Sequence, residues 1–139
     1  MTMVICDTHA LLFWTDRRER LSATALTTLE DGRAAGTLAC SAISLWEIAM
    51  LCRKGRLVLP PGVTPADYMD LIVQALGLAV LPITPAIAAR AESGIIPHGD
   101  PADRLIAATA LVHGVPLVTV DQQLHQFCAR NPALQGGEG

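Results

Sequence analysis

Four short apolar runs recur along the chain, and each has the length of one buried strand. They span residues 3–6, 38–41, 78–81 and 117–119. A strand with one face in water alternates apolar and polar residues, whereas these runs show no such alternation. The pattern therefore predicts strands that are covered on both faces.

Helical patterns separate the four runs. Most of them begin with a polar cap, sometimes followed by proline, and most have a glycine close to their end. The predicted helices span residues 8–13, 22–30, 43–54, 64–76, 84–93, 100–113 and 122–127, and glycines 32, 55, 77, 94 and 114 are predicted to close five of them. Strands that alternate with helices predict an α/β fold with a central parallel sheet. We expect a single domain over residues 1–130 and a frayed C-terminal tail over residues 131–139.

The composition is that of a folded domain and excludes two classes of protein. Hydrophobic residues make up 51% of the 139 positions and charged residues only 17%, which excludes a disordered chain. The formal net charge of −3 argues against a broad basic surface for nucleic acid. Any contact with nucleic acid must therefore be local.

The sequence has neither an obvious membrane anchor nor an export signal. The uncharged stretch 71–89 is interrupted by Gly77, Pro82 and Pro85, which leaves pieces too short to span a bilayer. The N-terminal stretch lacks a basic region and carries Asp7 within its apolar run. The four cysteines lack CxxC spacing and fit reduced thiols in the core. We therefore expect a cytoplasmic protein without membrane contact.

Four acidic residues occupy positions from which they can converge. Asp7 and Asp121 each follow an apolar strand, and Glu47 and Asp103 each lie in the first turn of a predicted helix. In open parallel sheets, ligands bind beyond the carboxyl ends of the strands. Clustered carboxylates repel one another, and a hard cation such as Mg2+ or Mn2+ relieves that repulsion. Phosphodiester cleavage by a metal-activated water is the chemistry that such a site supports.

Each of these carboxylates also has a purely structural interpretation. Ser44 and Glu47 have the spacing of a capping box, Asp103 suits the positive end of a helix dipole, and Asp121 suits an N-cap. Asp7 is the exception, because nothing in the local sequence appears as its partner. Taken one at a time, the structural interpretations are the simpler ones, so the combination of all four carries the functional hypothesis.

Four motifs carry a resemblance to a known family. They are DTHALLFW at residues 7–14, SAISLWEIAM at 41–50 followed by KGRL at 54–57, DPADRLIAAT at 100–109, and LVTVD at 117–121. Together they closely resemble PIN-domain toxins of the VapC type, and the resemblance covers nearly the whole chain. It implies a three-layer α/β/α fold and a metal-dependent endoribonuclease that acts as the toxin of a type II toxin–antitoxin module.

The resemblance also implies roles for individual residues and partners. It implies that Asp7, Glu47, Asp103 and Asp121 hold Mg2+ or Mn2+, with Asp100 close by. It further implies a homodimer and a cognate antitoxin whose C-terminal segment blocks the active site, often with an arginine. Thr119 and Thr8 are predicted to hydrogen-bond a ligand carboxylate or a metal-bound water and so to support the ligands.

Several other residues invite a functional interpretation. His98 and His9 lie near the proposed site, but we favour loop and helix-surface roles for them. Trp14 and Trp46 fit packing better than base stacking. Two basic clusters are weaker candidates for RNA contact, since charge clusters are commonly solvated surface: Arg17, Arg18 and Arg20, and Arg53, Lys54 and Arg56. Arg17, Arg18, Arg53 and Lys54 are the candidates we select from them. Arg104 is expected to pair with a neighbouring carboxylate.

Two other classes of protein compete with the nuclease. One is a non-catalytic PIN-fold protein-binding module, against which the intact set of four carboxylates argues. The other is a phosphatase of the haloacid-dehalogenase type, which also begins with a strand-terminal aspartate. That class needs a second aspartate two residues further on, and this chain has His9 there.

Overall fold

Four parallel strands form one sheet in the computed structural model, which describes residues 2–135. In sheet order they are β3 (Ala79–Leu81), β2 (Leu38–Ser41), β1 (Val4–Cys6) and β4 (Leu117–Val118). The central strand β1 aligns Ile5 with Ala39 of β2 on one side and with Leu117 of β4 on the other. The predicted α/β class and the parallel sheet are confirmed.

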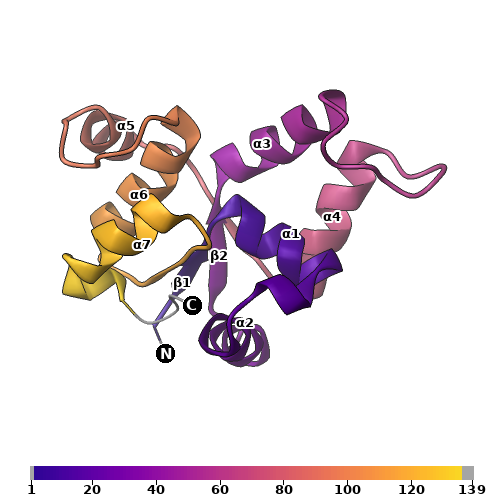
Figure 1. Cartoon of the computed structure of the whole chain (residues 1–139), viewed down its shortest axis with the longest axis horizontal. Helices are drawn as coiled ribbons and strands as arrows, with labels where there is room; N and C mark the ends of the chain where they lie inside the picture. The colour runs from indigo at the N-terminus through magenta and orange to yellow at the C-terminus, as the bar shows by residue number, and fades with distance from the viewer. Residues whose placement is uncertain (1, 136–139) are drawn as a thin grey trace.

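Helices lie on both faces of this sheet (Figure 1), but the edge strand β3 is mostly exposed, so the predicted burial on both faces is wrong for this strand. One layer holds α1 (Thr8–Asp16), α2 (Ala23–Ala35), α3 (Ala42–Arg53) and α4 (Pro65–Leu76), and the other holds α5 (Pro85–Ala91), α6 (Pro101–His113) and α7 (Gln122–Ala129). A separate cluster of buried apolar side chains fills each interface between helices and sheet. The result is the three-layer α/β/α arrangement, in which short strands need helices on both sides to be buried.

The sheet order determines where a ligand can bind. The chain winds outward from β1 to β2 and β3, and then returns to place β4 on the other side of β1. This reversal leaves a crevice beyond the carboxyl ends of β1 and β4, where ligands bind in open α/β sheets. Asp7 follows β1 directly, and Asp121 follows β4 after two further residues.

The predicted end of the second helix is wrong. Gly32 was expected to close it, but α2 continues to Ala35 and ends at Gly36, which has the left-handed φ of 71°. Gly32 has a different function, because a Cβ there would lie 2.4 Å from Cδ2 of Leu38. The glycine allows α2 to pack closely on β2 rather than ending the helix.

The start and the buried face of α3 also differ from the prediction. Its N-cap is Ser41, whose hydroxyl accepts a hydrogen bond from the backbone N–H of Ile43. Ser44 is therefore inside the helix and forms no capping box with Glu47. Trp46 points away from the core and is 57% exposed, so the packing role predicted for it is wrong.

Two further segments depart from the expected pattern. Helix α5 ends at Ala91, before Ser93 and Gly94. In the segment expected to be frayed, Pro132–Leu134 form a 3-10 turn and Leu134 is fully buried. Its burial among apolar side chains under α6 and α7 explains why this part packs. Residues 136–139 lie outside the described residues.

Other predictions about the core and the surface are in line with the structure. Cys6, Cys40 and Cys128 are buried, and Trp14 is only 7% exposed. Among the described residues, no helix has both the length and the apolar character needed to cross a membrane.

Candidate active site

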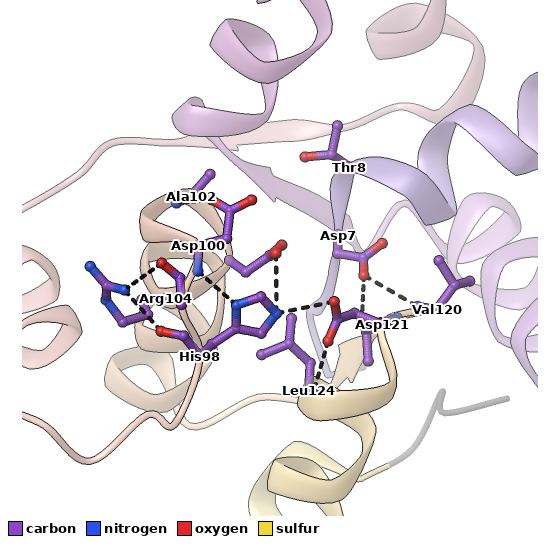
Figure 2. Close-up of polar contacts among 12 residues, drawn as sticks. Asp7, Thr8, His98, Asp100, Ala102, Arg104, Val120, Asp121 and Leu124 are labelled. Atoms are coloured by element: carbon purple, nitrogen blue, oxygen red, sulfur yellow. Dashed lines mark hydrogen bonds and ion pairs between the residues drawn. The ribbon is translucent and has the colours of Figure 1, made fainter. Parts of the chain in front are cut away.

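Asp7 is held at the carboxyl end of β1 by three hydrogen bonds. Its Oδ1 accepts from the backbone N–H of Ala10 at 2.7 Å, because Asp7 is the N-cap of α1. Its Oδ2 accepts from the Thr119 hydroxyl and from the backbone N–H of Val120, the latter at 3.2 Å (Figure 2). The local sequence thus offers Asp7 a partner after all, in the first turn of its own helix. Burial nevertheless raises the pKa of Asp7, against the lowering effect of these donors.

Glu47 projects from the second turn of α3 toward the same crevice and is 5% exposed. Thr8 supports it, with 2.5 Å between Thr8 Oγ1 and Glu47 Oε1. The Thr8 hydroxyl has one proton, and a charged acceptor at this short distance takes it. Thr8 therefore accepts from the Ser44 hydroxyl at 2.9 Å, which gives the order Ser44 to Thr8 to Glu47. Burial raises the pKa of Glu47, and the charge of Asp100 adds to that effect.

Asp100 and Asp103 come from the start of α6. Asp100 is the N-cap, and its Oδ1 accepts from the backbone N–H of Ala102 at 2.9 Å. Asp103 lies in the first turn of α6, and its carboxylate faces the crevice. Oxygen atoms of Glu47, Asp100 and Asp103 all lie within 4.8 Å of one another. Burial, and then the charge of Asp100, raise the pKa of Asp103 to about 7.

Asp121 caps α7, and its Oδ1 accepts from the backbone N–H of Leu124 at 3.0 Å. Its Oδ2 lies 3.0 Å from Nε2 of His98, which also lies 3.3 Å from Oδ2 of Asp103. Burial opposes ionisation of Asp121, but the hydrogen bonds from His98 and from Leu124 outweigh it and lower the pKa. Figure 2 shows the His98 ring directed toward Asp121 from the loop before α6.

Three of the four predicted ligands, Glu47, Asp103 and Asp121, therefore belong to two overlapping groups of closely spaced side chains. Asp103 belongs to both: it groups with Glu47 and Asp100, and with His98 and Asp121. Asp7 adjoins the cluster from the strand side but is in neither group of closely spaced ligand atoms among the described residues. Thr119 links the two sides, since its hydroxyl donates to Asp7 and accepts from the backbone N–H of Asp121 at 3.0 Å.

The donor set fits a hard divalent cation. Glu47, Asp100 and Asp103 offer only carboxylate oxygens, which Mg2+ and Mn2+ favour. Burial and mutual repulsion raise the pKa of both Glu47 and Asp103, so their ionised forms lack sufficient compensation from the protein alone. A cation among these oxygens supplies that compensation.

A cleft of about 600 Å3 begins at these carboxylates and extends over α1 and the end of α3. Glu47 and Asp100 line its acidic end, and Arg17, Arg20 and Arg56 line the remainder together with His9, Leu12, Phe13, Asp16, Met50, Leu51, Leu57 and Val58. One open cleft thus joins an acidic cluster to three guanidinium groups. The guanidinium groups can bind phosphates directly, whereas the acidic end can approach a phosphate only through a cation.

The structure separates the four basic residues predicted to contact RNA. Arg17 lines the cleft, whereas Arg53 and Lys54 are exposed outside its lining. Arg18 is committed elsewhere: its guanidinium lies 4.3 Å from the centre of the Trp14 ring and 3.6 Å from Glu30. Arg104 pairs with Glu92 at 3.0 Å, as the sequence predicted.

Sequence reasoning missed three kinds of contributor. His98 was assigned a loop role, yet its side chain is 9% exposed and contacts two of the carboxylates. Ser44 was considered only as a cap, and Arg20 and Arg56 were named in the two basic clusters, but their neighbours were selected as the RNA-binding candidates. The one available signal for His98 was its position two residues before a predicted N-cap, which places it at the mouth of the site.

Fold and site together define a PIN-domain protein. A PIN-domain family model matches residues 4–129, and the chain belongs to that family. It is similar to Ribonuclease VapC22 of Mycobacterium tuberculosis (strain ATCC 25618 / H37Rv), with 39% identity over 128 residues that cover 89% of this chain and 91% of that protein. The resemblance to VapC-type proteins predicted from the four motifs is confirmed.

Proposed function

We propose that this chain is a metal-dependent endoribonuclease and the toxin of a type II toxin–antitoxin module. The observation that carries the proposal is the convergence of Glu47, Asp100 and Asp103 within 4.8 Å at the crevice beyond the sheet. The similarity to a protein named as a VapC ribonuclease supports RNA as the substrate. Mg2+ or Mn2+ is the cofactor that fits these oxygens.

In this proposal Asp7, Glu47, Asp103 and Asp121 form the catalytic and metal-binding set, with Asp100 beside them. When bound, a divalent cation supplies an acidified water as nucleophile and offsets the charge that develops at phosphorus. The residues of the chain hold this cation and orient its ligands. Thr8 orients Glu47, and Thr119 fixes Asp7 relative to the start of α7. Arg17, Arg20 and Arg56 direct the RNA backbone along the cleft.

The partners follow from the family and remain proposals. A cognate antitoxin blocks the cleft, and its C-terminal segment reaches the acidic cluster with an arginine. The toxin acts as a homodimer in the cytoplasm. A cationic side chain suits the acidic end of the cleft, because Glu47 and Asp100 line it.

The decisive experiment is cleavage of total cellular RNA by the purified, antitoxin-free protein. We expect discrete products with Mg2+ or Mn2+, none with EDTA, and a loss of at least about 100-fold for Asp103→Asn. Asp67→Asn is the matched control, because Asp67 is also in the first turn of a proline-started helix but is exposed. Cleavage that survives EDTA, or the Asp103 substitution, would overturn the nuclease assignment. A protein that cleaves no RNA and binds no Mn2+ by calorimetry would instead be the non-catalytic binding module.

A second experiment tests the path of the RNA. Two double variants are compared for binding of labelled single-stranded RNA in EDTA. The cleft pair combines Arg20→Glu and Arg56→Glu, and the outer pair combines Arg53→Glu and Lys54→Glu. Both reverse the same number of charges. Each lost phosphate contact reduces the slope of log affinity against log salt by about 0.7. We expect a reduction of about 1.4 for the cleft pair and little change for the outer pair. Equal effects of the two pairs would remove the cleft from the proposal.

A further inference from the structure

The imidazole of His98 bridges two regions of the site through both of its nitrogens. Its Nδ1 accepts a hydrogen bond from the backbone N–H of Asp100 at 3.0 Å. Its Nε2 lies 3.0 Å from Oδ2 of Asp121 and 3.3 Å from Oδ2 of Asp103. These contacts occur where the loop after α5 meets the start of α6 and the start of α7 (Figure 2).

The backbone contact determines which nitrogen carries the proton. A backbone N–H can only donate, so Nδ1 must present its lone pair to Asp100. A neutral imidazole with a lone pair on Nδ1 carries its proton on Nε2. Nε2 therefore donates its one proton to the carboxylate of Asp121 at 3.0 Å, and the carboxylate of Asp103 lies beside this N–H at 3.3 Å.

The same contact argues against His98 as a metal ligand. Spacing alone would group His98 with Asp103 and Asp121 as three potential ligands. Coordination through Nε2 needs a lone pair there and moves the proton to Nδ1. That proton would then face the backbone N–H of Asp100, donor against donor, at the N-cap of α6.

The loop that carries His98 is itself held in place. Nη1 of Arg104 donates to the backbone oxygens of His98 at 2.8 Å and Gly99 at 3.2 Å. Nε and Nη2 of Arg104 donate to Oε2 of Glu92 at 3.1 and 3.0 Å, which fixes the guanidinium. The planar fork of an arginine suits this double role. The backbone and the ring of His98 are therefore both fixed.

We infer that His98 is a positioning residue of the proposed metal site: its Nε2–H orients Asp121 and faces Asp103, and it does not bind the cation. This inference rests on the proposed function. The ring hydrogen-bonds one oxygen of Asp121 and lies beside one oxygen of Asp103. Without His98 the proposed ligands are all carboxylates, a set without nitrogen that favours Mg2+ and Mn2+ over softer metals.

The first test reads the tautomer directly by 15N-detected NMR of the histidine rings. We expect the protonated, pyrrole-type signal on Nε2 of His98 in EDTA, and the same signal after Mg2+ is added. Exposed His113 at the end of α6 is the internal control. A proton on Nδ1 of His98 in EDTA, or a move of the proton to Nδ1 with Mg2+, would overturn the inference.

The second test measures the Mn2+ affinity of variants by calorimetry. His98→Gln keeps an N–H donor near the position of Nε2, whereas His98→Ala removes it. We expect His98→Ala to bind Mn2+ about tenfold more weakly, and His98→Gln to recover most of that loss. His113→Gln is the control substitution. Equal affinities of wild type and His98→Ala, or equal losses in both His98 variants, would refute a positioning role. If wild type binds no Mn2+, the proposed function fails, whereas the NMR result still decides the tautomer.

Discussion

The acidic cluster has a strand side at Asp7, which follows β1, and a helix side at Asp103, at the start of α6. The carboxylates of the two sides have different surroundings. On the strand side, Asp7 accepts hydrogen bonds from the backbone N–H groups of Ala10 and Val120 and from the Thr119 hydroxyl. On the helix side, Asp103 contacts the His98 imidazole at 3.3 Å and is surrounded by the charges of three other carboxylates. Both carboxyls have a raised pKa, with burial as the largest cause.

The difference indicates two kinds of acidic residue within one site. The protein itself satisfies the oxygens of Asp7, so this carboxylate also holds β1, β4 and α1 together. Asp103 has far fewer donors, and a bound cation would stabilise its anionic form. The fold therefore depends more on Asp7, and cation binding depends more on Asp103.

The largest expected effect is on folding of the metal-free protein. Asp7→Ala leaves three buried donors without their acceptor and should lower the free energy of unfolding by about 3 kcal/mol. Asp103→Ala removes a repelled carboxylate and should leave that free energy unchanged or higher. Urea denaturation in EDTA at neutral pH measures both. Equal losses in the two variants would mean that the two sides of the cluster do not differ in this way.

The next effect is a pH dependence that belongs to Asp103. Its pKa is about 7 in the folded protein and 3.8 in an ordinary aspartate, so the folded state holds more protons between these values. Stability contributed by protonated Asp103 is therefore complete below about pH 4 and is lost as the pH rises through 7. We expect wild type in EDTA to lose about 2 kcal/mol more than Asp103→Asn between pH 5 and 7.5. Parallel pH profiles of the two proteins would contradict this, and saturating Mg2+ should flatten the wild-type profile.

The sequence predicts much of this arrangement because topology is encoded in short local patterns. Apolar strands separated by capped helices require a covered parallel sheet, and that sheet brings Asp7 and Asp121 to one edge. Errors arose where one residue type serves two purposes. Gly32 looks like a helix stop but accommodates Leu38, and Ser44 looks like a cap but donates to Thr8.

The remaining part of the site depends on contacts that no local pattern encodes. His98 lies in a loop, and its direction is determined by Arg104 and by the N-cap of α6. Where the chain turns after α3 determines which basic side chains of that segment line the cleft. That turn places Arg56 on the cleft and leaves Arg53 and Lys54 outside its lining. Such features require the tertiary structure.

A smaller effect tests the hydrogen bond from the Thr119 hydroxyl to Asp7, which links the segments that follow β1 and β4. Thr119→Val keeps the shape of the side chain but removes the donor to Asp7 and the acceptor of the Asp121 backbone N–H. We expect a loss of about 1.5 kcal/mol in the free energy of unfolding in EDTA. Thr109→Val is a matched control, because Thr109 is equally buried and its hydroxyl donates only to the carbonyl of Leu105 in its own helix. A similar loss in both variants would show that burial of the threonine, rather than its bond to Asp7, determines the cost.

The smallest effect concerns Glu47, which combines features of both sides. It has a protein donor, as Asp7 does, and groups with Asp100 and Asp103 around the proposed cation. Thr8→Val removes that donor and the acceptor of the Ser44 hydroxyl, so the protein should bind Mn2+ about threefold more weakly and its free energy of unfolding should fall by about 1 kcal/mol. Thr8→Ser retains the hydroxyl and should restore the affinity. If Thr8→Val instead destabilised the fold as much as Thr119→Val, Glu47 would belong with Asp7, and only the start of α6 would be specialised for the cation.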